Sequence, residues 1–309
     1  MVKFLNKGKY LKKMLLGLGD EMKSIKNIST PYLFLLPALI GLLLFKIYPI
    51  FSAFLQSLFT RQFLTVEQVF VGFANYSSLF TDPVFWNSLK VTAYFNLIIN
   101  PLQVILAFGL AVLLNYQIRA IPIFRGINFI PVCISIPTAA ILWDIMLSPE
   151  QGVVNSILIS LNLSPQPFLA SDSQALLSLI AIASWRGIGY WALFFLAGLQ
   201  EVPKSLYEAA SIDGANLWQR FKNITFPMMK RPLTFVVVSV TVANMLLFSP
   251  MYILTSGGPK QSTNVLMLES YNNAFLYSNM GRANAIVVII LLITLVVIAI
   301  QFKLLRPKH

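Results

Sequence analysis

Few side chains in this sequence have the chemistry that catalysis or metal binding requires. The single cysteine is Cys133, and the single histidine, His309, is the last residue. One thiol cannot form an internal disulfide, and it provides no pair of metal ligands. No imidazole is available for a buried catalytic dyad. A hydrolase active site is therefore disfavoured, and we expect neither a metal site nor a cofactor bound by this chain.

A few polar and aromatic residues lie instead inside long apolar stretches. Trp185, Arg186, Gly187 and Tyr190 follow one another closely, and Asn244 lies in a later apolar run. Ionisable groups inside a membrane are costly and normally face protein or water. A guanidinium there can donate hydrogen bonds to sugar hydroxyls while a ring stacks on the apolar face of the sugar. An amide can both donate and accept. These five residues are candidates for a solute pathway.

Each of these residues also has a structural interpretation. Arg186 is suited to capping a broken helix or to pairing with a partner subunit. Asn244 is suited to an interhelical hydrogen bond, as are Asn96 and Asn100 in an earlier apolar run. The sequence leaves both interpretations open.

The elements that must position these residues are membrane spans. Apolar residues make up 57% of the 309 positions and charged residues only 11%, whereas an ordinary soluble domain carries about 25% charged residues. A helix crossing the bilayer needs about 20 apolar residues. Six stretches meet this requirement, near Tyr32–Phe54, Val91–Leu114, Ile127–Leu147, Ala175–Leu199, Leu233–Leu254 and Ala285–Leu305. The composition therefore predicts an all-α polytopic membrane protein with six transmembrane helices.

The cations predict how these spans are oriented. The net charge is +12, but the lysines and arginines form short clusters between the apolar runs, which is typical of membrane topology and not of nucleic-acid binding. Seventeen cations lie in the two terminal segments and alternate loops, against four in the other loops. Positively charged loops stay in the cytoplasm. We therefore expect both termini to be cytoplasmic and the loop at Thr255–Ala283 to lie outside.

Residues 1–30 form a basic segment ahead of the first span. Apolar residues recur there every three or four positions among seven lysines, a pattern that suits a helix lying on the anionic cytoplasmic leaflet. A mobile basic tail is the alternative. The first long apolar run greatly exceeds the core of a signal peptide. Residues 31–309 are then a single six-span domain.

The cytoplasmic loop at residues 200–231 has a pattern of its own. Pro203 suits the first turn of a helix, and Gly214 suits a left-handed stop after it. Apolar residues then recur at three-residue spacing until Pro227, which is expected to end the unit. Two short amphipathic helices are predicted, too short to be stable without packing. Such a unit is expected to dock against another protein.

Residues 208–227 read EAASIDGANLWQRFKNITFP. They closely resemble the EAA signature of binding-protein-dependent ABC importer permeases, with Phe226 in place of the usual leucine. The resemblance implies a type I ABC importer permease fold. It also implies that a separate ATPase contacts the matching positions, which are Glu208, Ala209, Ala210, Asp213, Gly214, Ile224 and Pro227.

Three further stretches narrow the resemblance to sugar-type permeases. VGFANYSSLFTDPVFWNSL (residues 71–89), LWDIMLSPEQGVVN (142–155) and LTSGGPKQST (254–263) are similar to segments of the maltose-type first permease, in its compact six-span form. The resemblance to this permease implies that Trp185, Gly187, Tyr190 and Asn244 lie on the spans that contact the sugar. The implied function is translocation of a sugar, polyol or glycoside across a bacterial inner membrane.

The resemblance also implies partners. The chain has no GxxxxGK[ST] phosphate loop, so a separate chain is expected to bind ATP and Mg²⁺. The expected assembly contains a second permease subunit, two ATP-binding subunits and an extracytoplasmic solute-binding protein in a lipid membrane. Alternatives are a permease for an osmolyte, glycerol phosphate or amino acid, and, more remotely, a secondary transporter. The last would need intramembrane carboxylates in paired broken helices.

Overall fold

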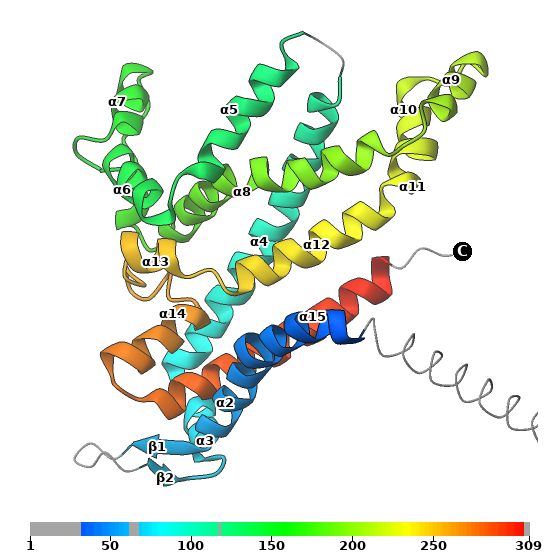
Figure 1. Ribbon diagram of the computed structural model, residues 1–309. Helices are drawn as coiled ribbons and strands as arrows, with labels where there is room; N and C mark the ends of the chain where they lie inside the picture. The colour runs from blue at the N-terminus through cyan, green and yellow to red at the C-terminus, as the bar shows by residue number, and fades with distance from the viewer. Residues whose placement is uncertain (1–31, 62–67, 117–118, 306–309) are drawn as a thin grey trace, which may run out of the picture. The chain divides into compact units, whose positions relative to one another are not determined.

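The computed structural model describes residues 32–61, 68–116 and 119–305, and these are mostly helical (Figure 1). The chain divides into two compact units, Met1–Leu55 and Gln56–His309. The basic segment at residues 1–30 lies outside the described residues, so its interfacial helix stays a prediction.

The first unit contributes one long apolar helix, Tyr32–Gln56, with a mean hydropathy of 2.1 in its most apolar stretch. Its 25 residues span about 37 Å at 1.5 Å each, enough to cross a hydrocarbon core of about 30 Å. It contains a π-helical turn, Leu43–Ile47, followed by α2, Tyr48–Gln56. The wider turn lies just before Pro49, whose ring would otherwise clash with a carbonyl of the preceding turn.

Four long helices form the frame of the second unit. They are α4 (Pro83–Leu114), α8 (Ala175–Gln200), α12 (Lys230–Met245) and α15 (Met280–Leu305). Helix α4 begins eight residues before the predicted span, because Asp82 caps it by accepting a hydrogen bond from the backbone N–H of Val84 at 2.8 Å.

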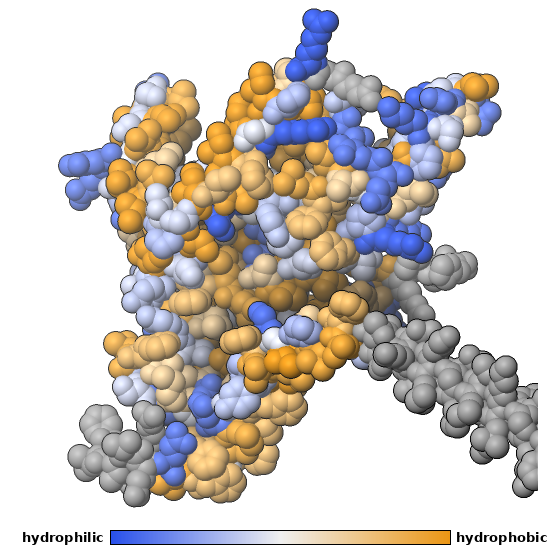
Figure 2. Space-filling model, in the orientation of Figure 1, coloured by the Kyte–Doolittle hydropathy of each residue, from blue (hydrophilic) through white to orange (hydrophobic). Residues whose placement is uncertain are grey.

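The core of this unit lies where α4 packs against α8 and α12. Ala107 and Ala111 of α4 are fully buried beside Phe195 of α8 and Val236 of α12. Small residues on α4 let the neighbouring helices approach closely, as is usual between membrane helices. Elsewhere the surface is largely hydrophobic along the helices (Figure 2), as expected for helices whose solvent is lipid. Hydrophilic side chains gather around α9–α11 in the same view.

Two of the predicted spans are broken. The third, predicted as one helix over Ile127–Leu147, consists of α5 (Ile121–Cys133) and α6 (Ile136–Met146), which meet at 98°. Pro137 follows this break, and Ser135 caps α6 through the N–H of Thr138. The fifth, predicted over Leu233–Leu254, ends as α12 at Met245 and resumes as α13 at Ser249, followed by Pro250. Both prolines lie in the first turn of the helix that resumes, where their missing N–H costs nothing. In an unbroken helix each ring would clash with the carbonyl four residues earlier, which explains both breaks.

The described residues thus contain five helices long and apolar enough to cross a membrane, and a sixth span if α5 and α6 together make one. The prediction of an all-α polytopic protein with up to six spans is confirmed. A short antiparallel hairpin was not predicted: β1 (Phe59–Arg61) pairs with β2 (Gln68–Phe70), with Thr60 opposite Val69.

The remaining elements connect the long helices. They are α3 (Ala74–Phe80), α7 (Val153–Ser160), a 3₁₀ turn (Phe168–Ala170), α9 (Lys204–Ile212), α10 (Leu217–Arg220), a π-helical turn (Phe221–Thr225), α11 (Phe226–Met228), α13 (Ser249–Leu254), α14 (Leu266–Tyr271) and a π-helical turn (Asn272–Leu276). Within the second unit, α9–α11 lie at one end, and β1, β2 and α14 lie at the opposite end (Figure 1).

Candidate functional site

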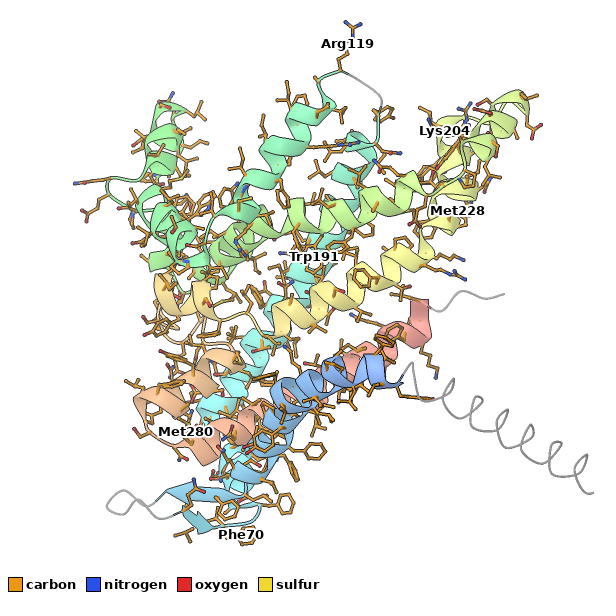
Figure 3. All side chains as sticks on the ribbon, viewed as in Figure 1. Phe70, Arg119, Trp191, Lys204, Met228 and Met280 are labelled. Atoms are coloured by element: carbon orange, nitrogen blue, oxygen red, sulfur yellow. The ribbon has the colours of Figure 1, made fainter. Side chains whose placement is uncertain are left out.

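A cavity of about 380 Å³ lies between α4, α8, the broken pair α5–α6 and the junction of α12 with α13. We call it the amide cavity, because two carboxamide side chains lie in its wall. Its lining residues are Gln103, Val132, Ile136, Ala139, Ala140, Ile182, Ala183, Arg186, Gly187, Tyr190, Trp191, Ala243, Asn244, Leu247 and Pro250. Trp191 is labelled near the middle of α8 in Figure 3. Four of the five sequence-predicted pathway residues therefore line one cavity.

Asn244 holds α12 to α4. Its Nδ2 donates to Oδ1 of Asn100 at 2.8 Å and to Oε1 of Gln103 at 3.1 Å, and the residue is only 6% exposed. Its Oδ1 has no hydrogen-bond partner among the described residues, although it belongs to a residue of the cavity wall. The same side chain thus makes the interhelical bond and presents a free acceptor, so the two interpretations left open by the sequence are compatible.

Gln103 was missed as a site residue. Its Nε2 donates to the carbonyl of Ala183 on α8 at 3.2 Å, and its Oε1 accepts from Asn244, so it joins three helices. The signal was present in the sequence, because Asn96, Asn100 and Gln103 recur at spacings of four and three residues within an apolar run. That spacing puts all three amides on one face of α4.

Arg186 reaches across to the break between α5 and α6. Its Nε donates to the carbonyl of Ile134 at 3.3 Å, so it satisfies a backbone group that the break leaves free. The two Nη atoms have no partner among the described residues. The cavity lining contains no acidic side chain, so the guanidinium charge is not neutralised by the described wall.

Of the remaining predicted pathway residues, two line the cavity and one does not. Tyr190 lines the cavity and is 42% exposed, with its ring packed edge-on against Trp191 at 4.8 Å and Phe194 at 5.2 Å. Gly187 also lines it, and a Cβ there would lie 2.8 Å from Nε2 of Gln103. Trp185 is not part of the lining; its ring packs edge-on against Trp143 at 5.5 Å.

The second candidate region is the segment of α9 and α10, Lys204–Arg220, which we call the α9–α10 segment. The two helices predicted here are present. Gly214 lies between them with φ +75°, and no atom lies within 4 Å of a Cβ built on it. Asn216 then forms a capping box with Gln219, in which each side chain binds the other's backbone N–H. The left-handed glycine and the capping box together set the turn between the helices.

The side chains of the EAA signature are turned outward. Glu208, Ala209, Asp213 and Gly214 are exposed, while Ala210 is half-buried. Ile212 and Leu217 are also exposed, although both are large and apolar. Such a surface on short helices needs a cover that the described chain does not supply.

The two prolines of this region differ from their predicted positions. Pro203 lies at the N-cap of α9 and not in its first turn. Pro227 does not end the unit: it lies within α11, close after the π-helical turn Phe221–Thr225, in which Ile224 is half-buried. The wide turn removes the clash that the proline ring would cause, so the chain continues almost without interruption into α12.

The family described as "binding-protein-dependent transport system inner membrane component" matches residues 27–307. The chain belongs to this family. The match covers both the amide cavity and the α9–α10 segment, and the family membership predicted from the EAA signature is confirmed.

Proteins similar to this chain are permease proteins of transport systems. The probable ABC transporter permease protein YurN of Bacillus subtilis is 38% identical over 283 residues, covering 90% of this chain and 96% of its own. The sn-glycerol-3-phosphate transport system permease protein UgpA of Agrobacterium fabrum is 35% identical, covering 91% of this chain and 96% of its own. A solved bacterial ABC transporter involved in the import of the acidic polysaccharide alginate shares the fold, with a TM-score of 0.79, 24% identity and coverage of 93% of this chain and 98% of its own.

Proposed function

We propose that this chain is one permease subunit of an ATP-driven importer and passes a sugar, or a related polyol or glycoside, through the amide cavity. The observation that carries the proposal is the amide cavity, through its size and its lining residues. Its volume of about 380 Å³ lies within the range of about 300–1,000 Å³ that small-ligand sites occupy. The acceptor Oδ1 of Asn244 and the aromatic ring of Tyr190 suit the two faces of a sugar.

The partners follow from the family and from the exposed signature. A separate pair of subunits binds ATP and Mg²⁺ and docks on the α9–α10 segment. A second permease subunit completes the pore, and an extracytoplasmic binding protein delivers the solute. A solved alginate transporter of the same fold is in complex with a periplasmic protein bound to alginate pentasaccharide, which supports the last of these partners.

The orientation rests on the cations, and the geometry is compatible with it. Lys204 and Met228 lie at one end of the second unit, and Phe70 and Met280 lie at the other (Figure 3). With Cys133 replaced, a cysteine at the exposed position Glu150 is expected to react with an impermeant thiol reagent applied from outside. A cysteine at the exposed position Lys204 is expected not to react. The reverse pattern would overturn the orientation.

The test of the pathway is Asn244→Ala in the whole transporter, reconstituted in liposomes. The change removes two hydrogen bonds and leaves the oxygens of Asn100 and Gln103 unsatisfied. Each buried unsatisfied group costs about 1–3 kcal/mol, so we expect a reduction of uptake of about tenfold or more with the subunits still assembled. Asn128→Ala is the matched control, because Asn128 is half-buried and its side chain bonds only within its own helix, at 2.8 Å. Equal uptake by the two variants would contradict the proposal.

A second candidate solute is an anion such as glycerol phosphate. It is favoured by the guanidinium of Arg186, whose Nη atoms are unpaired in a wall without acidic residues. Planar guanidinium groups bind carboxylates and phosphates through paired hydrogen bonds. If the solute is anionic, Arg186→Gln is expected to abolish uptake, and neutral sugars are expected not to compete with uptake by the wild type. Competition by a neutral glycoside alone would favour the sugar.

A further inference from the structure

A second cavity, of about 580 Å³, lies at the end of the second unit where α4 and α15 begin. We call it the outer cavity, following the proposed orientation. It is built mainly from polar groups, which are Asp82, Ser256, Gln261, Asn264, Glu269, Asn272, Asn273, Tyr277 and Arg282, with Val84, Gly257 and Gly258 completing its wall. The two cavities share no lining residue.

Glu269 of α14 is the unusual member of this wall. It is only 6% exposed. Its Oε1 accepts from Nδ2 of Asn273 at 2.7 Å, and its Oε2 accepts from Nδ2 of Asn264 at 2.9 Å. Neither donor carries a charge. No lysine or arginine of the described chain pairs with this carboxylate.

The only cation of the wall is already engaged. Arg282 binds the carboxylate of Asp82 through Nη2, and its Nη1 donates to the hydroxyl of Ser78 at 3.1 Å. The outer cavity therefore carries two carboxylates against one guanidinium, and the uncompensated charge is that of Glu269. A buried charge is normally paired, because its removal from water is costly.

A buried polar atom among the wall residues lacks a hydrogen-bond partner. Oδ1 of Asn264 is buried without a hydrogen bond, in a residue that is only 5% exposed. It lies 3.5 Å from the position of a Cβ on Gly257. Turning the amide over would direct Oδ1 at the carboxylate of Glu269, so the hydrogen bond to Glu269 fixes the unsatisfied orientation. Glu269 is thus the acceptor of the cavity with unused hydrogen-bonding capacity, and it is held by an amide that leaves its own Oδ1 unsatisfied.

The unused hydrogen-bonding capacity of the Glu269 carboxylate suits an organic cation better than a metal ion. Among the described residues there is no group of three or more His, Cys, Asp or Glu side chains that could hold a metal. A carboxylate has about four lone-pair sites, of which two are occupied here, and a guanidinium or ammonium group can use the others. The amides and the hydroxyl of the wall match the remaining N–H groups of such a side chain.

We propose that the outer cavity receives a lysine or arginine side chain of the extracytoplasmic solute-binding protein, which pairs with Glu269. The inference rests on the proposed function, in which that protein docks on this face. The loop at residues 255–283 contributes most of the wall and lies on the side assigned to the outside by the distribution of cations. Seating a basic side chain in this cavity neutralises Glu269 and adds a charge-assisted contact to docking.

The test uses the whole transporter in lipid nanodiscs, with ATP hydrolysis measured against the concentration of solute-loaded binding protein. Glu269→Gln keeps the size of the side chain and removes its charge. We expect the half-saturating concentration to rise about tenfold or more, with the basal rate and subunit assembly unchanged. Raising the salt concentration is expected to weaken docking less in this variant than in the wild type. Asp172→Asn is the matched control, because its exposed carboxylate is already paired with Lys260 at 3.0 Å.

A second variant avoids the buried network. Gln261 is an exposed residue of the wall, and Gln261→Lys places a tethered ammonium at the cavity, where it competes with the incoming side chain. We expect a higher half-saturating concentration, and no such rise for Gln261→Glu. Half-saturation within twofold of the wild type for both Glu269→Gln and Gln261→Lys would overturn the proposal. If the binding protein fails to stimulate the wild-type complex, the proposed function itself falls.

Discussion

The amide cavity and the α9–α10 segment reach their functional geometry in different ways. In the cavity, the polar side chains are fixed by the chain itself, since Asn244, Gln103 and Arg186 each bind another helix. In the α9–α10 segment, the signature residues Glu208 and Asp213 point outward and bind nothing else in the described chain. The polar groups of the cavity are held by contacts within the chain, whereas the signature residues of the segment are exposed.

The difference follows from length and burial. Three of the helices that line the cavity, α4, α8 and α12, have 16 to 32 residues and pack against one another. The segment is built on helices of nine and four residues, and isolated helices shorter than about 12–15 residues are marginal in water. A change in the cavity is therefore expected to alter the solute step, whereas a change in the segment is expected to alter coupling to the ATPase.

The largest effect is expected at Gly214. Its φ of +75° lies in the left-handed region, and nothing lies within 4 Å of a Cβ there, so a side chain acts through the backbone alone. A β-branched residue at this φ is strained by about 1–3 kcal/mol. Gly214→Val is expected to abolish uptake while leaving the spans inserted, with ATP hydrolysis lost or no longer responsive to the binding protein.

The control at this position is Gly214→Asn, because asparagine tolerates the left-handed region. It is expected to retain most of the uptake. Normal transport by Gly214→Val would show that the α9–α10 segment does not transmit the action of the ATPase, and the contrast between the two regions would disappear.

An intermediate effect is expected at Gly187 in the cavity wall. A Cβ there would lie 2.8 Å from Nε2 of Gln103, so Gly187→Ala displaces that amide from Ala183 and disturbs Asn244. We expect uptake to fall several-fold, with the response of ATP hydrolysis to the binding protein retained. Gly109→Ala is the control, because a Cβ at Gly109 meets no atom within 4 Å. A loss of coupling in Gly187→Ala would mean that the two regions are not separable.

The smallest effect is expected at Trp185, which lies outside the cavity lining. Trp185→Ala removes the edge-on contact with Trp143, worth about 0.5–1.5 kcal/mol, and uptake is expected to stay within about twofold of the wild type. Tyr190→Ala opens the wall of the cavity and is expected to reduce uptake more and to change which solutes compete. Solute competition assays on both variants measure the difference, and the opposite ranking would move the pathway to the Trp185 side of α8.

The elements that the sequence predicted well are those with strong, local signals. The long apolar runs, the left-handed Gly214 and the two helices around it all depend on residue type and short-range spacing. Pro137 and Pro250 interrupt the predicted spans and favour kinked helices, but the sequence did not locate the full breaks at Ile134 and at Leu246–Phe248. Membrane helices tolerate proline whenever neighbours satisfy the freed groups, and the hydrogen bond from Arg186 to Ile134 is a tertiary contact.

The contacts that form the cavity are also tertiary, so local spacing does not predict them. Asn244 was recognised as a polar group in a span, but its partners Asn100 and Gln103 come from more than 140 positions earlier in the chain. No local pattern relates such distant residues. The functional roles of the pathway and signature residues stay predictions until the variants are measured.

The nearly continuous helical path from Leu217 through the π-helical turn and α11 into α12 has a mechanical consequence. Helix α12 has 16 residues and is therefore a rod about 24 Å long, with Asn244 next to its far end. A tilt of about 10° imposed at Lys230 would displace that end by about 4 Å, more than the reach of a hydrogen bond of about 3 Å. Moving as a rigid rod, α12 would act as a lever, and a small rotation at the α9–α10 end would suffice to release Asn244 from Asn100 and Gln103.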